Sequence, residues 1–187
     1  MKCMKPILIF IAFFVSLGSF AQEKQKNTLS ISYFGEMVTH PGFRIGMEVP
    51  VGKWGKDKDN ILVASPSVGM FHHKRYQTSY FLMPDFALKK KAKEGLEYSV
   101  GFGVGFQLSV IPNTFYIGPQ DSVIQISASH WYFLGNISFA LEKTILSKRD
   151  KPMIIFLKPQ LTYAYPSFPN RVGYFVLEFG CKREISF

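Results

Sequence analysis

The stretch from Leu96 to Val110 reads LEYSVGFGVGFQLSV, in which large apolar residues alternate strictly with small or polar ones. A period of two sustained over this length predicts a β-strand with one bulky face and one small or polar face. The small face carries Gly101, Gly103 and Gly105, which predicts a tightly packed interior on that side. The bulky face then points out of the structure, where lipid would cover it.

Composition fits a single domain with an apolar exterior. The chain has 187 residues, of which 16% are aromatic and 19% are charged, against about 25% charged residues in an average soluble domain. Beyond the N-terminal segment, no run of about eighteen apolar residues predicts a membrane-spanning helix. A membrane β-barrel does not need such a run, because half of each strand faces inward and can be polar.

The first 21 residues have the pattern of a secretory signal peptide. Lys2 and Lys5 form a basic region, positions 7–15 (ILIFIAFFV) are apolar, and Ser19-Phe20-Ala21 has the small-x-small form of a cleavage site. We expect cleavage near Ala21, which leaves a mature domain of residues 22–187.

Eight segments of the mature chain are predicted strands. In the second of them, Ile45 and Met47 lie on the face opposite Arg44 and Glu48, as the period of two requires. Prolines 66, 84 and 159 fall inside three of the segments, where a residue without an N–H favours a bulge or an interruption. The predicted strands are 28–38, 42–52, 61–72, 76–89, 96–111, 127–144, 153–165 and 172–187.

The connections between these segments alternate in character. Those at 53–60, 89–95 and 147–152 are compact and basic, whereas those at 39–41, 72–76, 112–126 and 166–171 are rich in proline, aromatic or neutral polar residues. In an up-and-down barrel, alternate connections lie at the same end. We therefore expect the basic turns to share one end of the barrel with both ends of the mature chain.

The leader, the eight alternating segments and the final Phe187 resemble small bacterial outer-membrane β-barrels of the OmpX and OmpA-barrel type. The Ala-Gln junction after the leader and the aromatic-rich strands are similar in style to Bacteroidota members, and the resemblance covers residues 22–187. It implies an all-β fold, an eight-stranded antiparallel up-and-down transmembrane β-barrel, located in the cell outer membrane. The compact basic turns would then lie in the periplasm, since periplasmic turns are short in this class.

The same resemblance implies insertion by the barrel-assembly machinery. In this class the machinery reads a terminal strand that ends in an aromatic residue. Phe179, Ile185 and Phe187 lie on one face of the last predicted strand and would form the assembly signal. Arg183 lies on the same face and departs from the usual apolar pattern.

Charged residues on the inward faces of the predicted strands would form a polar network in the lumen. Buried charges are tolerated when they are paired or hydrogen-bonded, and an eight-stranded barrel is just wide enough for its own side chains. We expect a packed polar interior, with a proton or ion path as the alternative. The predicted members are Glu36, Arg44, Glu48, Asp85, Glu97, Glu142, Lys158 and Glu178, with Gln107 and Gln160 beside them.

The histidines give little indication of metal chemistry. His72 and His73 follow each other on a strand beside Lys74 and Arg75, so they point to opposite faces and their neighbours repel a cation. No metal and no other cofactor is predicted. Cys181, which is the lone cysteine of the mature chain, is most simply a small hydrophobic residue.

Two alternatives to a non-enzymatic barrel remain open from the sequence. His130 lies near Ser127 and Ser129, and His40 lies beside a tight turn, which leaves a lipid A-modifying deacylase or acyltransferase as one alternative. A secreted barrel of the lipocalin type that binds an apolar ligand is the other.

The leading prediction is an integral outer-membrane barrel with a non-enzymatic envelope role: structural, surface-interacting or part of a complex. Its expected partners are outer-membrane lipid, lipopolysaccharide and the assembly machinery, with other envelope proteins or glycans as further candidates. The net charge of +9 does not predict nucleic-acid binding, because the basic residues gather in turns without a stacking platform or recognition helix. These turns would contact anionic head groups or be solvated hairpin ends. The aromatic residues expected near the outer rim are Tyr76, Tyr80, Phe115, Tyr116, Trp131, Tyr132, Tyr163, Tyr165, Phe168 and Tyr174, with Trp54 at the inner rim.

Overall fold

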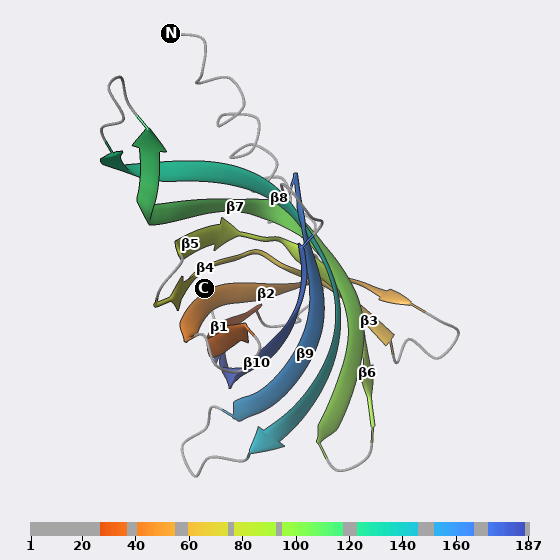
Figure 1. Cartoon of the computed structure of the whole chain (residues 1–187). Coiled ribbons are helices and arrows are strands. Elements are labelled where there is room, and N and C mark those ends of the chain that lie inside the picture. The colour runs from red at the N-terminus through yellow and green to blue at the C-terminus, as the bar shows by residue number, and fades with distance from the viewer. Residues whose placement is uncertain are drawn as a thin grey trace, which may run out of the picture.

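Ten β-strands form one antiparallel sheet that closes on itself (Figure 1). The computed structural model describes residues 27–36, 41–54, 60–74, 77–92, 95–117, 123–145, 152–166 and 172–185. The predicted leader and Phe187 lie outside these residues. The strands are β1 (Asn27–Glu36), β2 (Gly42–Trp54), β3 (Asn60–Ser65), β4 (Ser67–His73), β5 (Gln77–Leu82), β6 (Asp85–Lys91), β7 (Leu96–Ile117), β8 (Val123–Ile145), β9 (Met153–Tyr165) and β10 (Val172–Ile185).

Eight strand positions make up the closed wall. β1 pairs with both β2 and β10, which closes the barrel. β3 and β4 are consecutive halves of one long strand, since both pair with β2, and β5 and β6 are halves of the next, since both pair with β7. The fold class predicted from the sequence, an eight-stranded antiparallel up-and-down barrel, is therefore confirmed.

The prolines mark the interruptions that the sequence predicts. Pro66 separates β3 from β4, and Met83-Pro84 separates β5 from β6. The carbonyl groups of both prolines still accept hydrogen bonds from neighbouring strands, from Met47 N at 3.0 Å and from Val104 N at 3.2 Å. The wall therefore stays closed at both breaks.

Pro159 interrupts only the ladder around it. It lies inside β9, and the β8–β9 ladder pairs Ser138 with Gln160 and Leu141 with Leu157 but skips the residues between them. Pro159 has no N–H to donate there. The register is the same on both sides of the gap.

The prediction of a long connection at 112–126 is wrong over most of its length. β7 continues to Ile117 and β8 begins at Val123, so their hairpin extends beyond the rest of the barrel (Figure 1). A register shift between Ile111 and Thr114 absorbs Pro112, after which pairing resumes. The β-branched and aromatic residues of the segment favour this extension.

β7 has the two faces that its alternation predicts. Val100, Phe102 and Val104 lie outside with 57%, 58% and 42% of their surface exposed. The intervening glycines face inward, and a side chain at Gly103 would overlap the Asp85 carboxylate and meet the Asn136 amide oxygen. Glycine is therefore required here by close approach, not by a turn.

The interior has an apolar layer as well as a charged one, and the sequence reading missed the apolar layer. Its rings pack closely, with the centroids of Phe34 and Phe81 4.7 Å apart. Arg44 lies at the boundary between the layers, 6.0 Å from the centroid of the Phe34 ring. The apolar layer comprises Phe34, Phe71, Phe81, Met83, Leu134, Ala164 and Val176, with Tyr132 and Tyr174 packed against it.

Candidate functional site

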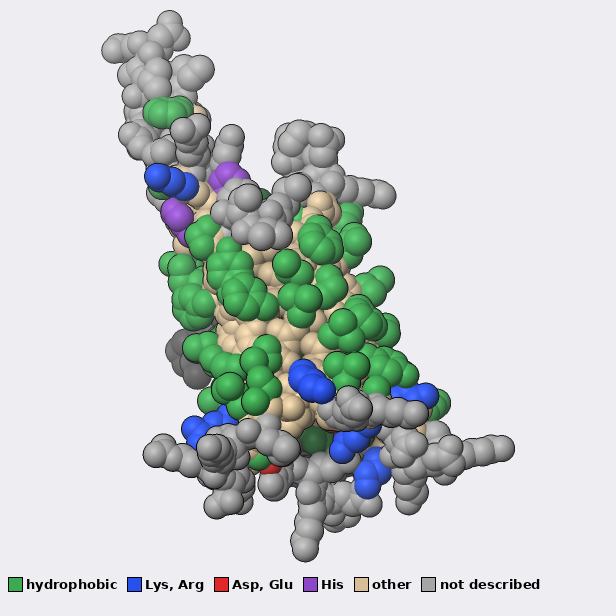
Figure 2. Space-filling view, turned by 90° about the horizontal axis from the view of Figure 1, so that it is seen from below, with side chains coloured by type: hydrophobic (Ala, Val, Ile, Leu, Met, Phe, Trp, Pro, Cys, Tyr) green, Lys and Arg blue, Asp and Glu red, His purple; other side chains and the backbone are tan. Residues whose placement is uncertain are grey.

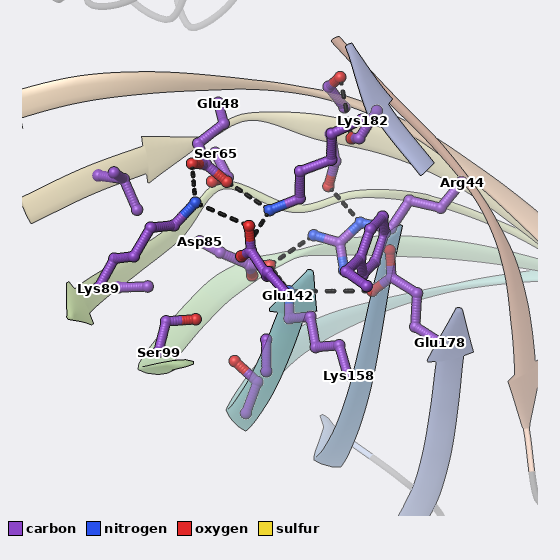
Figure 3. Close-up of a pocket in the computed structure, with 18 residues that line it drawn as sticks. Arg44, Glu48, Ser65, Asp85, Lys89, Ser99, Glu142, Lys158, Glu178 and Lys182 are labelled. Carbon is purple, nitrogen blue, oxygen red and sulfur yellow. Dashed lines mark hydrogen bonds and ion pairs between the residues drawn. The ribbon is translucent and has the colours of Figure 1, made fainter. Parts of the chain in front are cut away.

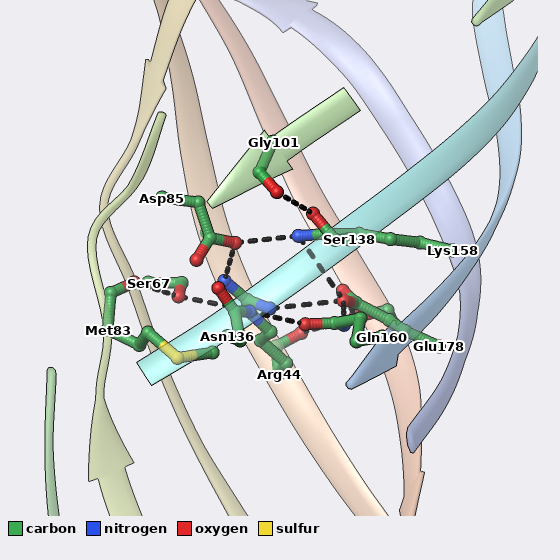
Figure 4. Close-up of polar contacts among 12 residues, drawn as sticks. Arg44, Ser67, Met83, Asp85, Gly101, Asn136, Ser138, Lys158, Gln160 and Glu178 are labelled. Atoms are coloured by element: carbon green, nitrogen blue, oxygen red, sulfur yellow. Dashed lines mark hydrogen bonds and ion pairs between the residues drawn. The ribbon is translucent and has the colours of Figure 1, made fainter. Parts of the chain in front are cut away.

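Arg44 joins four strands at the centre of the lumen (Figure 4). It extends from β2, and its Nη2 lies 2.6 Å from Asp85 Oδ2 on β6 while its Nη1 lies 3.1 Å from Glu178 Oε2 on β10. Its Nε donates to Ser67 Oγ on β4 at 2.8 Å. Because the Arg44 side chain is only 4% exposed, these partners replace its hydration.

Lys158 adds a second cation to this group, which we call the Arg44 cluster (Arg44, Asp85, Lys158 and Glu178). Its Nζ lies 2.6 Å from Asp85 Oδ2 and 3.9 Å from Glu178 Oε2. Gln160 Nε2 and Ser32 Oγ each donate to Glu178 at 2.6 Å. Two cations thus face two carboxylates, and the cluster is neutral overall.

A second neutral group lies nearer the start of β1, since Glu48 pairs with Thr28 whereas Arg44 pairs with Ser32. Its side chains are drawn in Figure 3. In this Lys89 cluster, Lys89 Nζ donates to both Glu48 and Glu142, the latter at 2.9 Å. Lys182 Nζ lies 2.5 Å from Glu48 and 2.8 Å from Glu142. The four side chains form a ring in which each cation lies between two carboxylates, and they join β2, β6, β8 and β10.

A cavity of about 50 Å³ lies between the two clusters and is lined by both. Ligand pockets usually enclose roughly 300–1,000 Å³. Two buried oxygens, Asp85 Oδ1 and Asn136 Oδ1, have no hydrogen-bond partner among the described residues. Little free space is therefore left between the two ion-pair clusters.

The structure brings most of the predicted lumen residues together. Arg44, Asp85, Lys158 and Glu178 form one cluster, Glu48 and Glu142 belong to the other, and Glu97 lies at its edge, 3.8 Å from Lys89 Nζ. Gln107 lies apart, hydrogen-bonded to Ser79 and Ser109. The side chain of Glu36 lies outside the described residues.

Two lysines of the Lys89 cluster were missing from the prediction. The sequence predicts Lys89 in a basic turn that contacts anionic head groups or is solvated, but its side chain is only 6% exposed and points inward. It lies four residues after Asp85, on the same face of β6, just as Lys182 lies four residues after Glu178 on β10. The period of two therefore predicts that both lysines point inward. The neighbouring lysines at positions 90 and 91 make Lys89 look like part of a basic turn.

Two of the predicted assembly-signal residues lie at different positions along β10. Phe179 is on the outside of β10, 54% exposed, with its ring centroid 5.2 Å from that of Tyr33. Ile185 is partly buried and pairs with Asn27 at the end of β1. Phe187 is not among the described residues.

Histidines and aromatic residues lie near the opposite rim. His72 Nδ1 is 2.9 Å from Thr78 Oγ1, and His130 is exposed and opposite Ser109 in the ladder. His40 and the side chain of Ser127 lie outside the described residues. Within the described ranges, no three His, Cys, Asp or Glu side chains are grouped as a metal site would require.

Two of the aromatic residues predicted near the outer rim point into the barrel. Tyr132 and Tyr174 pack against the apolar layer, and Tyr174 Oη donates to Gln107 Oε1 at 3.3 Å. Both lie an even number of residues from inward-facing positions, Leu134 and Val176, which explains their direction.

The outer surface is a broad apolar band (Figure 2). Lys and Arg side chains gather along its lower edge in that view, and histidines lie at the opposite edge. No helix in the described part of the chain is long and apolar enough to cross a membrane. The exposed members of the band include Ile31, Phe43, Ile45, Val68, Tyr80, Leu88, Val100, Phe102, Val104, Phe106, Trp131, Phe133, Ile137, Phe139, Leu157, Leu161, Phe175 and Phe179.

These features define a closed eight-stranded barrel with an ion-paired lumen and an apolar exterior. Among solved structures, the N-terminal β-barrel domain of Pseudomonas aeruginosa OprF is similar, with a TM-score of 0.47 and 15% identity over 86% of this chain and 98% of that one. The β domain of the Bordetella autotransporter BrkA is similar with a TM-score of 0.40 and 11% identity, over 87% and 74% of the two chains. No family model and no curated protein matches the sequence.

Proposed function

We propose that this chain is an integral outer-membrane β-barrel protein with a non-enzymatic envelope role. The observation that carries the proposal is the inverted distribution of side chains, with ion pairs inside and large apolar residues outside. A soluble monomer rarely exposes a contiguous apolar patch beyond a few hundred Å². Hydrocarbon would cover such a band.

Strand length and closure support the same proposal. A tilted transmembrane strand needs about 9–11 residues, and β9 and β10 have 13 and 14. A bilayer offers backbone groups no water to bond, so a spanning sheet must have no open edge. The pairing of β1 with β2 and β10 meets this requirement.

The packed lumen favours a barrel that neither conducts ions nor binds a ligand inside. Two neutral ion-pair clusters occupy one part of the interior, and the apolar layer of Phe34, Phe71, Phe81 and Met83 occupies another. The cavity between the clusters is far smaller than a ligand pocket. This packing argues against the lipocalin-type alternative and against an ion path.

The remaining parts of the proposal come from the sequence. They are removal of residues 1–21, insertion by the assembly machinery through Phe179, Ile185 and Phe187, and kinship with the OmpX type and with Bacteroidota members. Lipopolysaccharide and other envelope proteins or glycans are the proposed partners at the rim that bears the long β7–β8 hairpin. The role would be structural, that of a surface-interacting protein, or that of a subunit in a membrane complex.

Deleting the gene in the organism that encodes it tests this role. We expect greater sensitivity to detergents and bulky antibiotics, restored by the wild-type gene, with an unchanged lipid A mass spectrum. The His130→Ala variant should restore resistance as well as wild type does. A lipid A mass change on deletion that wild type reverses and His130→Ala does not would instead establish the lipid-modifying alternative.

A further inference from the structure

Among the side chains that the structure describes, the exposed charges are all positive, and most lie at one end of the barrel. Among the described side chains, no Asp or Glu is exposed, because the carboxylates lie in or beside the lumen. The exposed cations at the end where the chain enters β1 and leaves β10 are Lys53, Lys90, Lys91, Lys143 and Arg183. At the opposite end, Lys74 is the exposed cation of the described residues.

Three of these cations form a row around the outside of the wall. Lys90 on β6, Lys143 on β8 and Arg183 on β10 all point outward, on strands that are separated by one intervening strand. Consecutive cations are two strands apart and are also offset by two residues along the strands. With strands about 4.8 Å apart and a rise of about 3.3 Å per residue, they start roughly 12 Å from each other. We call this row the cationic girdle.

Apolar side chains lie on both sides of two of the three girdle cations. Lys143 is paired between Leu96 and Ile155, both exposed. Arg183 is paired between Leu29 and Met153, also both exposed. Long cationic side chains in such a setting lay their stems on apolar surface and direct their charge toward the polar edge.

Trp54 lies at the same level and close to the girdle. It pairs with Asn60, which pairs in turn with Lys90, so the three residues form one row across β2, β3 and β6. Trp54 is 67% exposed. Tryptophan at the border of an apolar band is typical of the membrane–water interface.

We propose that the cationic girdle binds the phosphate groups of anionic phospholipids in the leaflet around this end of the barrel. The inference rests on the proposed membrane location and adds a lipid preference to it. Cations at a bilayer surface attract anionic head groups, and no carboxylate among the described side chains is exposed as the girdle cations are. The acyl chains would lie against the apolar band beside each cation.

The two tryptophans of the chain, Trp54 and Trp131, provide matched reporters. Trp131 lies on the outside in the other half of the band, beside Leu108. In the Trp131→Phe protein, the remaining Trp54 reports on lipid at the girdle. In the Trp54→Phe protein, the remaining Trp131 reports on lipid far from it. Each is reconstituted in vesicles of phosphatidylcholine and phosphatidylglycerol, with the acyl chains of one lipid brominated to quench fluorescence.

Brominated phosphatidylglycerol should quench Trp54 several-fold more effectively than brominated phosphatidylcholine at equal mole fraction. The two lipids should quench Trp131 equally. Replacing Lys90, Lys143 and Arg183 together by Gln should remove the preference at Trp54, whereas Lys74→Gln should not. High salt should weaken the preference, because exposed charges are screened.

Equal quenching of Trp54 by both lipids, or a preference that survives in the triple variant, would overturn the girdle proposal alone. Absence of quenching at both tryptophans would instead contradict the membrane location. Heat-modifiable migration on gels checks that each variant is folded. If the triple variant does not fold, the single Arg183→Gln and Lys143→Gln proteins must each reduce the preference.

Discussion

At the scale of single residues, the barrel depends on a few side chains that satisfy several partners at once. Arg44 is the main example, because its guanidinium contacts two carboxylates and a hydroxyl from three other strands. Each of its partners is buried, and removing the guanidinium would leave them without the hydrogen bonds that it donates.

We predict that Arg44→Met destabilises the barrel by about 3–5 kcal/mol, because Asp85 and Glu178 would remain buried without their main cation. Urea unfolding of the reconstituted protein, followed by tryptophan fluorescence, measures the change. Lys74→Met, which replaces an exposed lysine outside both clusters and outside the girdle, is the control and should change stability by about 0.5 kcal/mol or less. Equal effects of the two substitutions would contradict the assigned role of Arg44.

Two glycines on adjacent strands allow a second matched comparison. A side chain at Gly103 would overlap Asp85 and meet Asn136, whereas one at Gly135 would meet nothing within 4 Å. Gly103→Ala should therefore cost about 1–3 kcal/mol, and Gly135→Ala should be neutral or slightly stabilising. A thermal or urea unfolding series checks both, and a harmless Gly103→Ala would show that the lumen packs more loosely than described.

At the scale of elements, β7 shows how the alternating sequence builds the wall, because its large apolar residues point outward and its small residues point into the lumen. Its outward residues run from Leu96 at the end with the basic turns through Val104 in the middle of the apolar band. The proposed membrane location implies that these positions differ in depth, so the same substitution should have different costs along the strand.

Val104→Arg should destabilise the barrel by about 2–4 kcal/mol if this position lies near the bilayer centre, whereas Leu96→Arg near the interface should cost about 0–1 kcal/mol. Equilibrium unfolding in lipid vesicles measures both values. Similar costs at the two positions would show that no depth gradient exists along β7.

The last strand allows a test of the proposed assembly signal. Deleting Phe187 should reduce the amount of heat-modifiable barrel in the membrane, while Phe187→Tyr, which keeps a terminal aromatic ring, should leave it unchanged. Quantitative gels of membrane fractions provide the measurement. Normal levels of the truncated protein would show that assembly does not require the terminal ring.

At the scale of the whole molecule, alternation predicts the barrel well and its interior only in part. The stretch from Leu96 to Val110 can be assigned to a strand with known inner and outer faces, because one face is large and apolar and the other is small or polar. Around Phe81 the sequence reads YFLM, where both faces are apolar, so the period of two has no contrast and the apolar layer is hidden. Contacts such as Arg44–Glu178 depend on the order in which strands close the barrel, which no local pattern contains.

The central claim is that hydrocarbon covers the outside of this wall. Spin labels at positions 100, 102 and 104, introduced as single cysteines after Cys181→Ser, test it most directly in the reconstituted protein, with a label at Lys91 as the solvent-exposed control. We predict that these three labels are more accessible to oxygen than to a water-soluble nickel complex, and that the control shows the reverse. Preferential access of the nickel complex to positions 100, 102 and 104 would contradict the account.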